Sequence, residues 1–190
     1  MMTSYESLLG KTELAILRML GLFDRPATTE EIGTLRADPA VPGLTDSLVG
    51  VGGRDWNRAL TRLRRIGLVA ADTGNVIDAH PLVRQHFSEQ LKNENLDTFR
   101  EGHRRLYEFL RTTAKEFPET IAEMGPLYAA VVHGCLAGKN QEALDEIWFK
   151  RILRGMEQYS TRKLAAFANE VATLSTFFDP PWERFASVEL

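Results

Sequence analysis

Apolar residues recur at helical spacing along most of the chain, and short polar or glycine-containing segments interrupt that pattern. A first helix is predicted around Leu14–Leu20, and the segment Asp24-Arg25-Pro26 ends it. Thr28 and Glu31 have the spacing of a capping box, in which the side chain of each residue accepts a hydrogen bond from the backbone N–H of the other. They predict a second, short helix that runs to about Leu35.

The segment Asp38–Gly53 is rich in glycine and proline, which predicts a loop before a third helix. Asp55 is the expected N-cap of that helix. Two short apolar stretches, Leu68–Ala71 and Val76–Ile77, flank Thr73-Gly74-Asn75 and predict a small hairpin. Three helices followed by a two-stranded β wing is the order of a winged helix-turn-helix domain.

The polar segment Lys92-Asn93-Glu94-Asn95 is the expected domain boundary, which gives a winged-helix domain over 1–92 and a helical domain over 93–190. Beyond it the pattern is helical throughout, and Ala137-Gly138-Lys139-Asn140 predicts a turn between two antiparallel helices. Paired helices with short turns indicate a tetratricopeptide-like α-solenoid, which we expect to be truncated at its C-terminal end. The expected fold class is therefore mainly α. Further helix ends are expected at Pro118 and at Asp179-Pro180-Pro181, and a last helix at Trp182.

Composition narrows the classes of partner and compartment. Of the 190 residues, 44% are hydrophobic and 26% are charged, which is typical of a folded soluble protein. The formal net charge of −3 argues against nucleic acid or an acidic membrane as the main partner. Cys135 is the only cysteine, which excludes an internal disulfide and suits a reducing cytoplasm. Neither a secretory signal nor an apolar run long enough to span a membrane is visible.

The segment around His80 has the strongest character of a site. His80 lies between the second apolar stretch of the hairpin and a helix that begins at Pro81. Free N–H groups and partial positive charge are expected at such a helix N-terminus, where they favour an anion such as phosphate. Arg84 lies one turn further and can share the face of His80, and Asp78 can orient the imidazole or cap the helix. The alternative is a histidine that only caps the helix or belongs to the core.

Other motifs give no catalytic arrangement. Gly10-Lys11-Thr12 imitates the end of a phosphate-binding loop, but the pattern requires a glycine where Tyr5 stands. His133 and Cys135 are two apart on a predicted helix and point in different directions, which argues against a metal site, and His103 fits a buried helical face. Since no nucleophile with a base is apparent, we expect no enzyme activity and no cofactor in this chain.

Arginines crowd the third helix, and Arg58, Arg62 and Arg65 share one face by their spacing. In a DNA-binding winged helix this would be the recognition helix, and arginine suits phosphates and guanine edges. The alternative is a solvent-exposed or protein-facing arginine surface. Acidic residues offset the basic ones in this half of the chain, which argues against DNA binding.

Three segments of the first half resemble the winged-helix region of signal-transduction (STAND) ATPases, the NACHT and NB-ARC proteins. These segments are Glu13–Pro26, Trp56–Val69 and Ile77–Phe87. The stretches Leu127–Gly155 and Ser160–Trp182 resemble the start of the repeat region of bacterial members. In that family the winged helix follows the ATPase core and precedes a repeat sensor.

The resemblance implies a role for His80. In NB-ARC proteins the matching histidine belongs to a Met-His-Asp motif and contacts the phosphate of bound ADP in the closed state. Here the triplet is Ala79-His80-Pro81, so only the histidine matches. The chain is then expected to be a regulatory fragment whose ADP or ATP belongs to the ATPase core of a parent protein, with a protein or ligand bound on the helical array. Two alternatives remain open, a DNA-binding transcription regulator with a helical effector or dimerisation domain, and a plain helical protein-interaction module.

Overall fold

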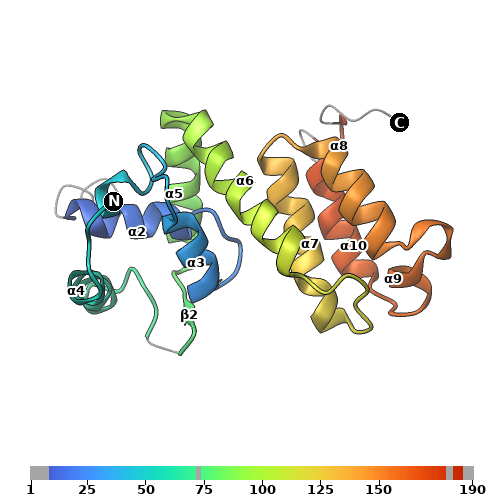
Figure 1. The fold of residues 1–190 in the computed structure, drawn as a ribbon, viewed down its shortest axis with the longest axis horizontal. Coiled ribbons are helices and arrows are strands. Elements are labelled where there is room, and N and C mark those ends of the chain that lie inside the picture. Colours follow the sequence, from blue (N-terminus) through green and yellow to red (C-terminus); the bar gives the residue numbers. More distant parts are fainter. Residues whose placement is uncertain (1–8, 72–73, 179–181, 186–190) are drawn as a thin grey trace. The chain divides into compact units, whose positions relative to one another are not determined.

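A computed structural model describes residues 9–71, 74–178 and 182–185 (Figure 1). The fold is mainly helical and contains a small two-stranded antiparallel sheet. The chain divides into two compact units, Met1–Gly102 and His103–Leu190, which we describe separately. The sequence placed the domain boundary at 92/93, whereas the division between the compact units falls later, inside a helix. Tyr5, Thr73 and Asp179-Pro180-Pro181 lie outside the described residues.

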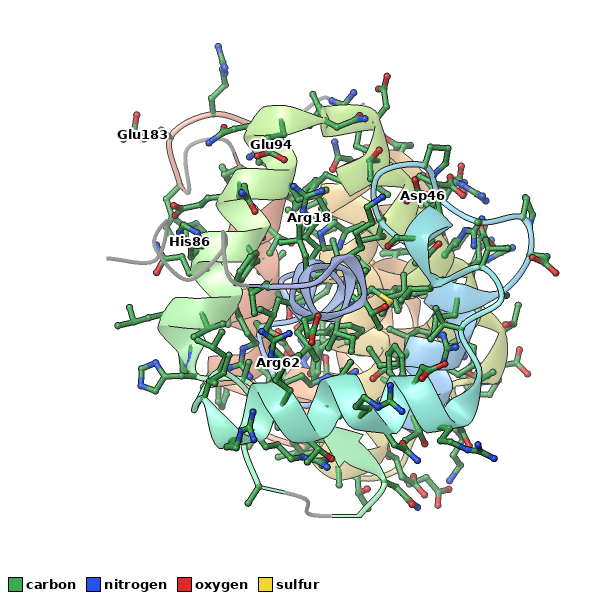
Figure 2. All side chains as sticks on the ribbon, turned by 90° about the vertical axis from the view of Figure 1, so that its left-hand side faces the viewer. Arg18, Asp46, Arg62, His86, Glu94 and Glu183 are labelled. Atoms are coloured by element: carbon green, nitrogen blue, oxygen red, sulfur yellow. The ribbon has the colours of Figure 1, made fainter. Side chains whose placement is uncertain are left out.

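The first unit consists of helices around one small sheet. Its elements are α2 (Lys11–Leu20), β1 (Ala27–Thr28), α3 (Thr29–Arg36), η1 (Asp46–Leu48), α4 (Gly53–Arg65), β2 (Val76–Ile77) and α5 (Pro81–Glu94). The core is formed by buried apolar side chains from all the longer helices, among them Leu17, Leu20, Leu35, Leu63 and Phe87. On one side of the unit, Arg18 of α2 forms an ion pair with Glu94 at the end of α5 (Figure 2).

The predicted capping box at the start of α3 is confirmed. The Thr28 hydroxyl accepts a hydrogen bond from the Glu31 backbone N–H at 3.2 Å, and the Glu31 carboxylate accepts one from the Thr28 N–H at 2.9 Å. The predicted N-cap of the next helix is wrong. That helix, α4, begins at Gly53 after Gly52, and Asp55 lies inside its first turn.

The predicted hairpin is also wrong in its pairing. β2 pairs with β1, with Ala27 opposite Ile77 and Thr28 opposite Val76. Leu68–Ala71 forms no strand, although the Ala70 N–H donates to the Asp78 carbonyl beside β2 at 2.8 Å. The reason lies at the end of α4, where the N–H groups of Leu68 and Val69 both bond to the Leu63 carbonyl at 3.0 and 3.4 Å. Amides that close a helix end cannot also donate to a strand ladder.

The second unit is a set of packed helices. The long helix α6 (Leu96–Thr113) spans the division between the units, and the remaining elements follow it. They are α7 (Ile121–Leu136), α8 (Asn140–Glu142), the π-helix η2 (Ala143–Ile152), η3 (Gly155–Glu157), α9 (Tyr159–Arg162), α10 (Phe167–Leu174) and η4 (Ser175–Phe177). In Figure 1, α7 and α10 lie side by side.

The predicted turn after α7 is present, because α7 ends at Leu136 and Gly138 adopts a φ of +79°. Two other boundaries differ from the expectation. The helix expected to continue to Pro118 ends at Thr113, where the Arg151 side chain donates to carbonyls beyond its last turn. Trp182 lies in a turn and not at the start of a helix, since Phe178 and Phe185 form a β-bridge around it.

The core of the second unit is apolar and closely packed. It contains Leu110 from α6, Leu127 and Val131 from α7, and Ile147 and Trp148 from η2. Gly134 lets these helices approach one another, because a β-carbon there would lie 2.8 Å from the Ala143 Cβ and 3.0 Å from the Tyr107 ring. Within the described residues, no helix is both long and apolar enough to cross a membrane.

Candidate functional site

His80 is the N-cap of α5 and is exposed to solvent. Its Nδ1 atom accepts a hydrogen bond from the Leu82 backbone N–H at 3.2 Å. An Nδ1 atom that accepts a hydrogen bond carries no proton, so the neutral ring holds its proton on Nε2. The histidine therefore caps the helix with one nitrogen and can donate a hydrogen bond with the other.

The expectation of free N–H groups at this helix N-terminus is wrong. Pro81 has no N–H, and the Leu82 N–H is bound by the imidazole. The N–H groups of Val83 and Arg84 both donate to the His80 carbonyl, at 2.8 and 3.1 Å. An anion that approaches α5 here meets the Nε2–H donor and the helix dipole, but not the row of open amides found in phosphate-binding loops.

Arg84 is buried and bonded to its own unit. Its guanidinium forms an ion pair with the Asp78 carboxylate and donates to the Asp24 carbonyl at 2.9 Å. The Asp78 carboxylate also accepts from the Ala79 N–H at 2.8 Å. These contacts connect the loop after α2, the segment after β2 and the helix α5, so Arg84 and Asp78 hold the segment around His80 in position.

The arginines of α4 form a second candidate surface. Trp56, Leu60 and Leu63 bury one side of this helix, and Arg58 and Arg65 are exposed. Arg54, in the first turn of α4, is also exposed. Arg58 lies 3.5 Å from Asp55 in an exposed ion pair, which adds little to stability.

Arg62 belongs only partly to this surface. Its side chain lies on the side of α4 that faces α2 (Figure 2). There it pairs with the carboxylate of Glu13 at 3.1 Å, and Glu13 is buried. The structure therefore places Arg58 and Arg65 on the outward side of α4, while Arg62 also connects α4 to α2.

Sequence reasoning missed a third group, the buried pair His103 and His133. The Nδ1 atoms of the two rings lie 2.9 Å apart, and the rings come from α6 and α7. His103 was expected on a buried helical face, and it is buried. The only signal in the sequence is that His103 falls on a predicted inner face, and that pattern does not reveal which residue lies opposite.

The lone cysteine has no reactive character. Burial raises the pKa of the Cys135 thiol to about 11, while a hydrogen bond with Thr176 acts weakly in the other direction. A neutral thiol is a poor nucleophile and a poor metal ligand. In the described part of the chain, no three histidine, cysteine or acidic residues lie together in the manner of a metal site.

Comparison with known proteins adds no relative. No family model matches the chain, and neither a curated protein nor a solved structure shows significant similarity to it.

Proposed function

We propose that this chain is a non-catalytic regulatory and protein-interaction fragment of a STAND-type signalling ATPase, in which His80 senses the nucleotide held by the ATPase core of the parent protein. The resemblance of the segments Glu13–Pro26, Trp56–Val69 and Ile77–Phe87 motivates this proposal. The observation that carries it is the geometry of His80, an exposed imidazole whose Nδ1 is used by its own helix and whose Nε2–H is directed by that bond.

In this proposal the unit Met1–Gly102 is a winged helix-turn-helix. Its helices α2, α3 and α4 precede β2 and α5, and the strand β1 between α2 and α3 supplies the partner of the wing. The contacts of Arg84 with Asp78 and Asp24 support the sensor role indirectly, because they fix the start of α5 against the rest of the unit. A donor held in this way loses little conformational freedom when it meets a phosphate oxygen.

The surface beside His80 suits a protein partner. Leu82, in the first turn of α5, is 67% exposed. An exposed apolar side chain beside a directed polar donor is the composition expected where one domain closes over another and its nucleotide. The Nε2–H of His80 would then contact the ADP phosphate, and Leu82 would pack against the ATPase core around it.

The helical unit is proposed to bind a protein or ligand as the first part of a tetratricopeptide-like array. Phe167 and Val171 lie one turn apart on α10, and both are exposed. A helix with apolar residues on both its inner and outer faces is suited to packing on two sides. Binding there would change the signalling state by favouring one domain arrangement over another.

The test uses a parent protein that contains the ATPase core, and it separates the helix cap from the phosphate contact. His80→Asn retains a good N-cap side chain but removes the Nε2–H donor, whereas His80→Ala removes both. We expect both variants to release ADP faster than the wild-type protein and to signal without stimulus. His80→Asn should be as stable to unfolding as the wild-type protein. Wild-type ADP retention and wild-type signalling in both variants would refute the sensor role.

A second candidate function is sequence-specific or general DNA binding through α4. The specific observation in its favour is that α4 carries five arginines and one acidic residue, with Arg58 and Arg65 exposed on the side away from the buried face. A fluorescence titration with duplex DNA at 20 mM and 200 mM salt tests it, with a paired Arg58→Gln and Arg65→Gln variant as the comparison. Binding that weakens steeply with salt and is lost in the variant would favour this function over the first.

A further inference from the structure

The side chains of His103 and His133 meet inside the second unit. Their exposed fractions are 1% and 5%, their Nδ1 atoms lie 2.9 Å apart, and their ring centroids lie 5.1 Å apart with an interplanar angle of 34°. The distance is that of an N–H···N hydrogen bond. His103 belongs to α6 and His133 to α7. The bond therefore joins two helices through residues that are 30 positions apart in the sequence.

The hydrogen bond limits how many protons the two rings can hold. One Nδ1 must carry a proton and the other must not, so the neutral pair consists of two different tautomers. A first additional proton can bind the distal nitrogen of the donor ring and leave the bond intact. A second would place an N–H on both facing nitrogens, with two like charges in a buried site, and the contact could not persist.

Three other ionisable groups of this unit do not titrate in the same range. Tyr107 lies one turn further along α6, and burial, with the nearby carboxylate of Glu142, raises its pKa to about 12. Cys135 follows in α7 with its pKa raised by burial to about 11. On the other face of α7, burial raises the pKa of Tyr128 to about 12. All three stay neutral between pH 5 and 8.

Several charged side chains of this unit form pairs with one another or with polar side chains. Arg111 and Lys139 both pair with Glu108 on α6, and Lys139 pairs also with Glu142 of α8. On η2, Glu146 pairs with Lys150 and Asp145 accepts from Gln141, and next to α10 the Thr161 hydroxyl donates to Glu170. Each of these side chains therefore has a partner other than the two imidazoles.

We propose that the His103–His133 hydrogen bond is an acid-sensitive contact that holds α6 to α7 near neutral pH and is broken on acidification. The inference is independent of the proposed function. An unfolded histidine titrates at about pH 6.5, so the unfolded chain binds a proton on both rings at pH 5, while the bonded pair holds at most one additional proton. Since the unfolded state then binds more protons, stability falls as the pH falls.

The direct test is NMR of the full chain with ¹⁵N-labelled histidine. An N–H···N bond transmits a scalar coupling between its two nitrogens, so we expect a cross-peak between the two Nδ1 atoms at pH 7.5. The cross-peak should disappear on acidification while the chain is still folded, together with faster hydrogen exchange of the α7 amides. A missing coupling at pH 7.5, or a coupling that survives until the pH at which the chain unfolds, would overturn the proposal. This measurement needs no variant.

A variant supplies an independent measurement. His103→Gln can still donate from its side-chain amide to the His133 Nδ1 but does not titrate. Each proton that the native pair excludes should lower the folding equilibrium constant of the second unit about tenfold per pH unit below about pH 6 in the wild-type chain. His103→Gln should reduce this slope, and His86→Gln, outside the pair, should leave it unchanged. Equal slopes in all three proteins would contradict the proposal.

Discussion

The Ala143 side chain of η2 packs against Gly134 of α7 so closely that a β-carbon added at Gly134 would lie 2.8 Å from the Ala143 Cβ. The same added β-carbon would lie 3.0 Å from the ring of Tyr107, which belongs to α6. Three elements of the second unit therefore meet at one position that has no room for a side chain. A side chain at Gly134 would therefore push these elements apart.

We expect Gly134→Ala to destabilise the second unit by about 1–2 kcal/mol, because overpacking outweighs the better helix propensity of alanine. Urea unfolding followed by circular dichroism measures this difference. Gly125→Ala, in the same helix and with open space around the added carbon, is the matched control and should be neutral or stabilising. A Gly134→Ala variant as stable as the wild type would show that α7 and η2 can separate at no cost.

Glu31 should make the first unit more stable at neutral than at acid pH. Burial alone would raise the pKa of its carboxyl, but hydrogen bonds from Arg25 and from the Thr28 backbone outweigh burial and lower the pKa. A lowered folded-state pKa means that the stabilisation is present above the unfolded value of about 4.3 and is lost as the pH falls through the folded-state value.

The measurement for this prediction is the unfolding free energy of Glu31→Gln and of the wild type at pH 7 and at pH 3. At pH 7 the variant should be less stable by about 1–2 kcal/mol, which corresponds to the loss of hydrogen bonds to a charged group. At pH 3 the difference should shrink. Glu30→Gln, exposed in the same turn, should show no such pH dependence, and a constant difference for Glu31→Gln would contradict the assignment.

Arg151 should be required to close the end of α6. Its guanidinium donates to the carbonyls of Arg111, Ala114 and Lys115 at 2.8, 2.7 and 3.1 Å. A lysine has one nitrogen and cannot reproduce this fork, so Arg151→Lys should cost about 1–3 kcal/mol although the charge is kept. Differential scanning calorimetry should record a lower Tm, with Arg162→Lys, an exposed arginine, as the control. An unchanged Tm in Arg151→Lys would refute the role.

Cys135 should resist alkylation in the folded chain. With its pKa raised by burial to about 11, the thiolate fraction at pH 8 is about a hundredth or less of that of an ordinary cysteine with a pKa of about 8.5. Mass spectrometry after iodoacetamide treatment at pH 8 should show slow modification that becomes fast in 6 M guanidinium. Rapid labelling of the native chain would mean that the thiol is accessible and ionised.

Local signals in the sequence predicted local structure well. The capping box of Thr28 and Glu31 and the turn at Gly138 depend on residues within a few positions of one another, and both are present. The hairpin failed because Leu68 and Val69 look like strand residues by side chain, while their amides are taken by the Leu63 carbonyl. Side-chain pattern does not tell which carbonyl a backbone N–H will reach.

The candidate site shows the same limit. The position of His80 before a helix followed from the proline and the apolar spacing, and the structure agrees. Arg84 pairs with Asp78 and also donates to the carbonyl of Asp24, which is 60 residues away. Sequence spacing could not reveal this tertiary contact. The meeting of His103 and His133 has the same origin, because it depends on the packing of two helices and not on a motif.

The cap of α5 has one more consequence. Because Pro81 lacks an N–H, His80 occupies that of Leu82, and the His80 carbonyl takes the next two, the start of this helix is saturated by its own residues. The start of α5 can therefore donate one hydrogen bond, from His80 Nε2–H, to a bound anion, but it cannot surround the anion with backbone N–H groups. Selectivity for any anion at this position must therefore come from a different polypeptide segment.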